Sequence, residues 1–109
     1  MNKYLFYFLL VFHTSLYCQN IGSLKGTVID SESGLPLEGA TVTVDKSNFF
    51  AVTDQNGFFE IVDLPTTTYN ITARFIGFKI QTKFNIIVKS AGNRSLDFVL
   101  SPMPDTLDE

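Results

Sequence analysis

The sequence contains one cysteine, one histidine and no tryptophan. The cysteine is Cys18 and the histidine is His13, and both lie in an apolar N-terminal stretch. A chain with a single cysteine cannot form an internal disulfide bond, so its fold must be held together by a hydrophobic core. The sequence after Cys18 cannot form a Ser–His or Cys–His pair, nor a zinc site built from histidine or cysteine. Paired carboxylates are the catalytic arrangement that remains.

The sequence also lacks an excess of positive charge and any long helical periodicity. It carries 8 basic and 11 acidic residues, for a formal net charge of −3. No basic stripe follows one face of a predicted element, so nucleic-acid binding is not expected. A length of 109 residues is typical of a single domain.

Residues 1–18 are predicted to be a secretory signal peptide. Lys3 supplies a positive charge, the apolar run at residues 5–12 follows, and polar and small residues come next. This run is less than half of the roughly 20 apolar residues that a membrane-spanning helix needs, so a transmembrane anchor is the weaker alternative. We expect cleavage between Cys18 and Gln19, which would remove one base and both Cys18 and His13.

Cys18 leaves a second interpretation of the N-terminus open. Lipoproteins carry a modified cysteine at their cleavage point. Tyr17 is large at a position where lipoprotein signals have a small residue. We therefore expect Cys18 to leave with the signal peptide, while the sequence alone does not settle whether it is lipidated.

Short segments of alternating apolar and polar residues recur between residues 24 and 100. Such alternation places one face of a strand in a core and the other in water. Turn-forming residues separate the segments, notably at 30–34, 45–48, 54–57 and 91–93. This pattern predicts seven short strands in a two-layer sandwich filled with phenylalanine. The residues predicted to face inward are Leu24, Val28, Ala40, Val42, Val44, Phe59, Ile61, Tyr69, Ile71, Ala73, Phe75, Phe78, Ile80, Phe84, Ile86, Val88, Leu96, Phe98 and Leu100.

Turn-forming residues, prolines and a glycine refine this prediction. The Asp-Gln-Asn-Gly sequence at 54–57 predicts a hairpin turn between the segments on either side of it. Pro36 and Pro65 are expected at sheet edges or in loops, where they would guard against edge pairing. Gly77 predicts a turn or a bulge. Residues 102–109 contain two prolines and three acids and are expected to be an acidic linker that leaves the domain.

The order of several motifs resembles the carboxypeptidase regulatory-like domain, which is itself similar to the transthyretin-like sandwich. The motifs are Gly-Thr-Val-Ile-Asp at 26–30, Gly-Leu-Pro-Leu-Glu-Gly-Ala-Thr-Val at 34–42, Thr-Asp-Gln-Asn-Gly-Phe-Phe at 53–59, Leu-Pro at 64–65 and Phe-Ile-Gly-Phe at 75–78. The resemblance covers about residues 23–101. It implies an all-β fold, a seven-stranded antiparallel β-sandwich of transthyretin-like or Ig-like Greek-key type, occupying residues 19–101.

The resemblance also implies a role. Such domains commonly follow the signal peptide of TonB-dependent outer-membrane receptors, which import nutrients such as glycans into Gram-negative bacteria. The Leu-Asp-Glu sequence at 107–109 is similar to the start of the segment that leads to the plug and barrel of those receptors. We therefore expect a non-catalytic module that needs no cofactor. Its location would be the periplasm or the outer membrane, and its partner the receptor's plug and barrel or another periplasmic protein.

Other functional hypotheses remain beside this one. The chain is either a piece of a longer receptor or a stand-alone secreted module that binds a glycan or a protein. A hydrolase is disfavoured, because the hydrolases of the transthyretin-like fold depend on histidines that the sequence after Cys18 lacks.

No catalytic, metal-binding or cofactor-binding residue is predicted. The loop at 54–57 faintly resembles a calcium loop, but it contains one carboxylate, Asp54, and Glu60 lies too near to be the distal ligand. A simple turn is therefore the better interpretation. Asp30, Glu32 and Glu38 are expected to be solvated loop acids rather than a ligand cluster.

Exposed aromatic residues are the remaining candidates for a ligand site. Phe49 and Phe50, with Tyr69, would make a sugar-binding platform if they lay together, and alternation sends Phe58 and one of the two adjacent phenylalanines outward. Without tryptophan or accompanying polar residues, ordinary packing is the better interpretation. Asn70 and Asn93 begin glycosylation-type triplets, which mean little in a sequence of bacterial appearance.

Overall fold

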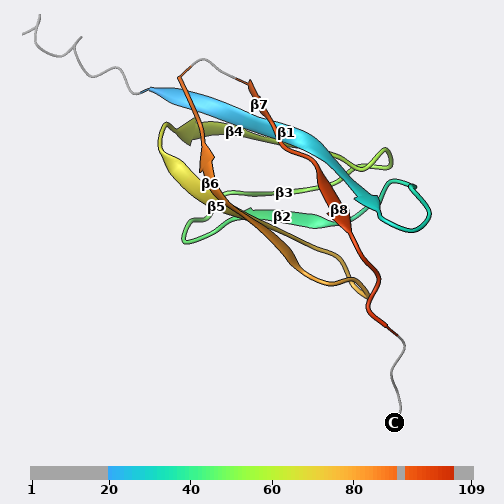
Figure 1. The fold of residues 1–109 in the computed structure, drawn as a ribbon. Coiled ribbons are helices and arrows are strands. Elements are labelled where there is room, and N and C mark those ends of the chain that lie inside the picture. The colour runs from blue at the N-terminus through green and yellow to red at the C-terminus, as the bar shows by residue number, and fades with distance from the viewer. Residues whose placement is uncertain (1–19, 91–92, 105–109) are drawn as a thin grey trace, which may run out of the picture.

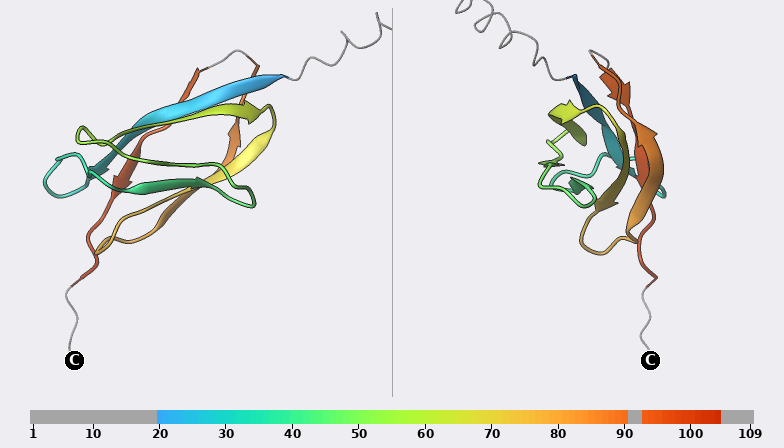
Figure 2. Two further views of the ribbon diagram at one scale, coloured as in Figure 1. Left: turned by 180° about the vertical axis from the view of Figure 1, so that it is seen from behind. Right: turned by 90° about the vertical axis from the view of Figure 1, so that its left-hand side faces the viewer.

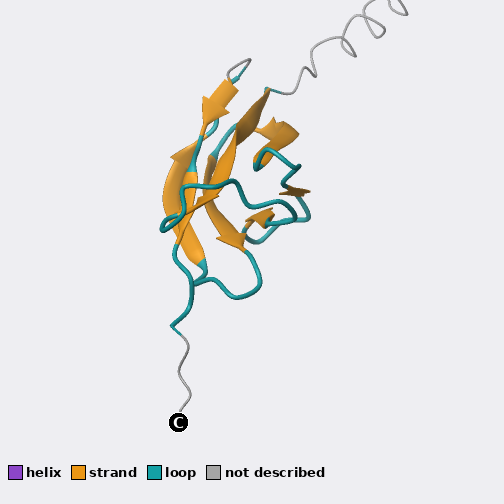
Figure 3. Ribbon diagram, turned by 90° about the vertical axis from the view of Figure 1, so that its right-hand side faces the viewer, coloured by secondary structure: helices purple, strands orange, loops and turns teal. Residues whose placement is uncertain are grey.

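The computed structural model describes residues 20–90 and 93–104 (Figure 1). Every regular element in these ranges is a β-strand, as Figure 3 shows, and none of these residues forms a helix that is long and apolar enough to cross a membrane. The expected signal peptide and most of the expected turn at 91–93 lie outside the described residues. The strands are β1 (Ile21–Asp30), β2 (Thr41–Val44), β3 (Phe50–Val52), β4 (Phe58–Pro65), β5 (Thr68–Arg74), β6 (Gln81–Ile87), β7 (Asn93–Ser95) and β8 (Phe98–Leu100).

The strands form two sheets that stack face to face, seen from the side in Figure 2. The first sheet has the order β4–β1–β7, and β8 also pairs with β1. The second sheet has the order β3–β2–β5–β6. The all-β sandwich that the sequence predicts is therefore confirmed.

Strand β1 is the centre of the first sheet. It pairs antiparallel with β4 and parallel with both β7 and β8. Two glycines permit its neighbours to approach: a Cβ on Gly26 would lie 1.8 Å from the carbonyl oxygen of Leu96, and one on Gly22 would lie 2.3 Å from that of Lys89. A side chain at either position would collide with main-chain atoms, so β1 requires glycine where Lys89 and Leu96 pass close to it.

The core lies between the two sheets and follows the predicted alternation in most strands. Phe59 from β4 and Phe98 from β8 meet with ring centroids 6.3 Å apart in a tilted arrangement, which is a favourable geometry for aromatic rings. Phe49, Tyr69, Phe75 and Phe78 pack against its rim. The buried apolar side chains are Leu24, Val28, Leu37, Ala40, Val42, Val44, Phe59, Ile61, Leu64, Ile71, Ala73, Ile86, Val88, Leu96, Phe98 and Leu100.

The last predicted strand, which carries Leu96, Phe98 and Leu100, differs from expectation because the structure has two short parts here, β7 before Leu96 and β8 at Phe98–Leu100. Both parts run parallel to β1 rather than antiparallel. At the break, the carboxylate of Asp97 accepts hydrogen bonds from the main-chain nitrogen and the hydroxyl of Thr27, at 3.0 and 3.1 Å. Leu96 donates its amide to the carbonyl of Lys25 at 2.8 Å. The side chain of Asp97 thus replaces a main-chain partner, and the described residues contain eight strands rather than seven.

The prediction of a hairpin at residues 54–57 is wrong, although the turn itself is present. Its two flanking strands belong to different sheets, because β3 pairs with β2 while β4 pairs with β1. Asp54 Oδ1 accepts the amides of Asn56 and Phe58 at 2.8 and 3.0 Å, which closes the turn locally. Turn chemistry of this kind reverses the chain without specifying the partner of the next strand.

The prediction that Ile80 and Phe84 face the core is also wrong. Both side chains are exposed, Phe84 with 65% of its surface. A bulge in β6 is the cause: Tyr69 pairs with Ile86 but Ile71 pairs with Lys83, so β6 contains one extra residue between the pairs. An extra residue exchanges the two faces of a strand, and the predicted alternation therefore holds on one side of the bulge only.

Asn85 occupies this bulge in the left-handed conformation, with φ of 59°. Asparagine adopts that conformation more readily than most residues do. The main-chain N–H of Asn85 donates to Asn70 Oδ1 at 3.1 Å. Asn70, noted above as a glycosylation-type asparagine, therefore has a structural role here.

Contacts with the domain continue past Ser101, the expected end of the sandwich. Lys79 donates its amide to the carbonyl of Ser101, and Met103 donates its amide to that of Gly77, each at 2.8 Å. Pro102 forms a bridge with Phe78. The first residues of the expected linker are therefore attached to the turn between β5 and β6.

Replacing Gly26 tests the close approach at β1. We expect Gly26→Ala to lower the free energy of unfolding by about 3 kcal/mol, because the methyl group meets a main-chain oxygen that cannot move without breaking the sheet. Gly34→Ala is the matched control: Gly34 has φ of 73° and open space around it, so this change should cost about 1 kcal/mol from the backbone alone. Urea unfolding measures both values, and equal losses would contradict the packing argument.

Candidate binding surface

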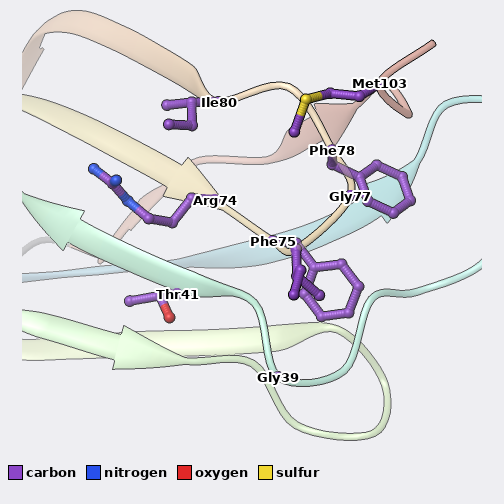
Figure 4. A pocket seen from close by; sticks show the side chains of 9 residues that line it. Gly39, Thr41, Arg74, Phe75, Gly77, Phe78, Ile80 and Met103 are labelled. Carbon is purple, nitrogen blue, oxygen red and sulfur yellow. The ribbon is translucent and has the colours of Figure 1, made fainter. Parts of the chain in front are cut away.

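An open pocket of about 430 Å³ lies beside the turn between β5 and β6 (Figure 4). Most of the side chains around it are apolar, and Arg74 is its one charged residue. It is lined by Gly39, Thr41, Arg74, Phe75, Ile76, Gly77, Phe78, Ile80 and Met103.

The turn that forms one wall is held by main-chain hydrogen bonds. Phe78 donates its amide to the carbonyl of Phe75 at 3.0 Å. Gly77 has φ of 86°, a conformation that favours glycine, and it accepts the amide of Met103. The rings of Phe75 and Phe78 lie 5.6 Å apart. These contacts within the domain hold the wall in place, so the wall is preformed.

Thr53 holds the opposite wall, which contains Gly39 and Thr41. The buried Thr53 hydroxyl donates to the carbonyl of Leu37 at 2.5 Å and accepts the amide of Ala40 at 2.8 Å. Gly39 donates its amide to the carbonyl of Thr53 at 3.0 Å. One threonine therefore joins the segment before β2 to the end of β3.

Arg74 ends β5 and lies between Thr41 and Ile80 (Figure 4). Its side chain is exposed, and within the described ranges its guanidinium has no hydrogen bond or ion pair. A guanidinium offers five N–H donors in a planar fork that matches a carboxylate. Apolar walls with one unpaired cation suit a ligand that combines an apolar side chain with a carboxylate.

The apolar lining continues onto the outside of the domain. Ile76 at the tip of the turn has 90% of its surface exposed, and Ile80 and Met103 are more than half exposed. Neighbouring exposed apolar residues of this kind commonly mark a site of interaction with another molecule. We call Arg74, Ile76, Ile80 and Met103, with the pocket between them, the turn surface.

A second hollow of about 390 Å³ lies among polar residues of the β2–β3 turn, β5 and β6. Asp45 in its wall accepts a hydrogen bond from the Thr72 hydroxyl at 2.9 Å. Tyr69 donates its hydroxyl to the carbonyl of Pro65, and burial raises the pKa of this phenol. Asp45 and Tyr69, two titratable residues of this hollow, therefore already have structural partners.

The aromatic residues singled out in the sequence do not form a platform. Phe49 and Tyr69 pack against the core. Phe50 has 62% of its surface exposed, which confirms that one of the adjacent phenylalanines faces outward. Phe58 also faces outward as predicted, but it lies in β4 of the other sheet.

The acidic residues have structural partners or stand apart from one another. Asp30 accepts the amide of Glu32 at 2.9 Å and the hydroxyl of Ser33 at 3.0 Å. Asp54 closes its own turn. Over residues 20–90 and 93–104, no three side chains of a metal-binding type come together.

Comparison with known proteins identifies the family. The family model of the carboxypeptidase regulatory-like domain matches residues 23–101. The chain belongs to this family. The regulatory-like domain is 39% identical over 79 residues to carboxypeptidase D of Mus musculus, and 36% identical over 90 residues to carboxypeptidase D of Homo sapiens. The matches cover 72% and 78% of the chain, but the chain spans only 6% of either relative.

Solved structures show the same fold at low sequence identity. A cohesin–X-dockerin complex from Acetivibrio cellulolyticus matches with a TM-score of 0.65 and 22% identity, over 74% of the regulatory-like domain's chain and 58% of the other chain. GBS52, the minor pilin of Streptococcus agalactiae, matches with a TM-score of 0.60 and 12% identity, over 84% and 48% of the two chains. These similarities support the sandwich fold.

Sequence reasoning missed the turn surface of the regulatory-like domain. The sequence predicts a turn or bulge at Gly77, next to Ile76, and places Met103 in the expected linker. The available signal was an isoleucine next to the glycine of that turn, at a position where polar residues are usual.

Removing the Thr53 hydroxyl tests how the pocket wall is held. We expect Thr53→Val to lower the free energy of unfolding by about 2 kcal/mol, because the carbonyl of Leu37 and the amide of Ala40 lose a buried partner. Thr43→Val is the control, since the Thr43 hydroxyl makes one long bond of 3.4 Å to the carbonyl of Thr72, and it should cost less than about 0.5 kcal/mol. Thermal unfolding of both variants checks this, and a Thr53 variant as stable as the Thr43 variant would refute it.

Proposed function

We propose that this regulatory-like domain is a non-catalytic, protein-binding module of an exported protein. We further propose that this protein is a TonB-dependent outer-membrane receptor, with the domain at its periplasmic N-terminus. The turn surface carries the proposal, because it combines a preformed apolar pocket with an unpaired cation at the place where the chain leaves the described domain.

The pocket is suited to binding rather than to catalysis. Its walls are fixed by the main-chain hydrogen bond that the Gly77 carbonyl accepts and by the bonds of the Thr53 hydroxyl, so a partner would lose little affinity to the ordering of loops. Among residues 20–90 and 93–104, its lining contains no histidine, cysteine or carboxylate, and these residues thus offer neither a general base nor an activated nucleophile.

The position of the pocket supports the hypothesis that its partner is the next domain of the same protein. Met103 lines the pocket and is among the last described residues. The first described residues lie at the opposite end of the sandwich (Figure 1). In a receptor of the proposed kind, the next domain would therefore begin beside the turn surface.

The receptor assignment draws on the sequence beyond the sandwich. The apolar segment at 5–12 supports export, and the Leu-Asp-Glu sequence at 107–109 is similar to the segment that precedes a receptor plug. A cohesin–X-dockerin complex of similar fold is an assembly of proteins, which agrees with a protein-binding role. The glycan-binding alternative is weaker, because Phe49 and Tyr69 do not join Phe50 in a platform.

The coding sequence downstream of Glu109 tests the receptor assignment. We expect it to continue in frame into a plug domain and a barrel. A stop codon followed by unrelated genes would refute this assignment, while the binding role would still be tested by the next experiment.

Variants of the turn surface test the binding role. We expect Arg74→Glu and Ile76→Glu each to weaken binding to the purified plug and barrel at least about tenfold, because a buried cation or apolar anchor often dominates an interface. The control is Val62→Glu, which changes an exposed residue of β4 in the other sheet and should leave the affinity unchanged. Isothermal titration measures all three, and equal affinities would contradict the proposal. Heat on addition of polysaccharide that is lost in Phe50→Ala would favour the glycan alternative.

A further inference from the structure

Strand β3 is an edge of the second sheet, and its main chain is open on one side. It pairs only with β2 among the described strands. Val44 donates its amide to the carbonyl of Phe49, and Thr53 donates its amide to that of Ala40. Because hydrogen-bonded pairs alternate along antiparallel strands, Ala51 is bonded to Val42. The N–H and C=O groups of Phe50 and Val52 therefore point away from β2, toward the open edge.

Other edges of the sandwich carry features that oppose pairing. Strand β4 contains Asp63 in the left-handed conformation and ends at Pro65. Strand β6 contains the bulge at Asn85. Strand β8 runs into Ser101, whose carbonyl is already bonded to Lys79. Bulges, prolines and covered ends are the usual protection of sheet edges.

Strand β3 has none of these features, and its length of three residues is its one protection. Its sequence is Phe-Ala-Val, without charge, proline or bulge. The side chains of Phe50 and Val52 are exposed on the outer face of the sheet. An uncharged, exposed edge of this kind is a template for another strand.

The sequence of β3 favours a second copy of itself as that strand. Antiparallel pairing about Ala51 places Phe50 opposite Val52 of the second copy, and Val52 opposite its Phe50. Both pairs use the free main-chain groups, and aromatic with β-branched residues is a favourable cross-strand combination.

We infer that two copies of this chain associate through β3, joining their second sheets into one continuous sheet. The contact closes on itself by a two-fold axis, so it forms dimers rather than fibres. It is weak and reversible, because three residues from each strand cover far less than the roughly 1,600 Å² of a typical stable interface. It uses a different part of the domain from the turn surface.

Sedimentation equilibrium of the full chain, expressed with its own leader and purified from the cell, tests this inference. We expect the weight-average mass to rise toward that of a dimer as the concentration increases to about 1 mM. Phe50→Lys combined with Val52→Lys should remain monomeric, because each new lysine faces another across the axis. A monomer at every concentration of the unaltered chain, or a dimer that survives the double change, would overturn the inference.

A charge-swapped variant separates β3 pairing from a folding defect. Phe50→Lys combined with Val52→Glu places opposite charges opposite each other, so we expect the dimer to return and to weaken with salt. Val62→Lys on the other sheet should leave dimerisation unchanged. Hydrogen exchange gives an independent readout: the amides of Phe50 and Val52 should become protected at high concentration only. A dimer in which these two amides still exchange freely would refute pairing through β3.

Discussion

The close approach of main chains along β1 is the constraint on which the rest of the structure depends. At Gly22 and Gly26 the carbonyls of Lys89 and Leu96 occupy the space that a Cβ would fill. This approach lets β1 pair with β4 on one side and with β7 and β8 on the other. The described residues contain no disulfide or metal cluster to take over this role, so burial of apolar side chains between the sheets supplies the main stabilisation.

The candidate functional features lie on the second sheet and at its ends. The first sheet is organised around β1, whereas the second presents an open edge at β3 and the turn surface next to β5 and β6. Thr53 links these two features, because it directly follows the edge strand and also holds Gly39 and Ala40 in the pocket wall. One sheet thus serves mainly as a scaffold, and the other offers surfaces for partners.

Sequence periodicity correctly predicts which side chains are buried in strands whose apolar and polar residues alternate without interruption. Leu24 and Val28 in β1 and Phe59 and Ile61 in β4 are buried as predicted. Periodicity fails where a tertiary contact intervenes, as at Asn85, whose bulge exchanges the faces of β6. The pocket was not predictable, because β2, the β5–β6 turn and the segment at Met103 meet only after folding. Turn chemistry at Asp54 shows the same limit, since it predicts the reversal but not the change of sheet.

Residue-resolved hydrogen exchange of the folded chain is the most direct test of the central role of β1. The amides of β1 that bond to its neighbouring strands should exchange only through global unfolding, and at low protein concentration those of Phe50 and Val52 at the open edge should exchange orders of magnitude faster. Exchange of β1 at the rate of the β3 edge, before the second sheet opens, would contradict the account.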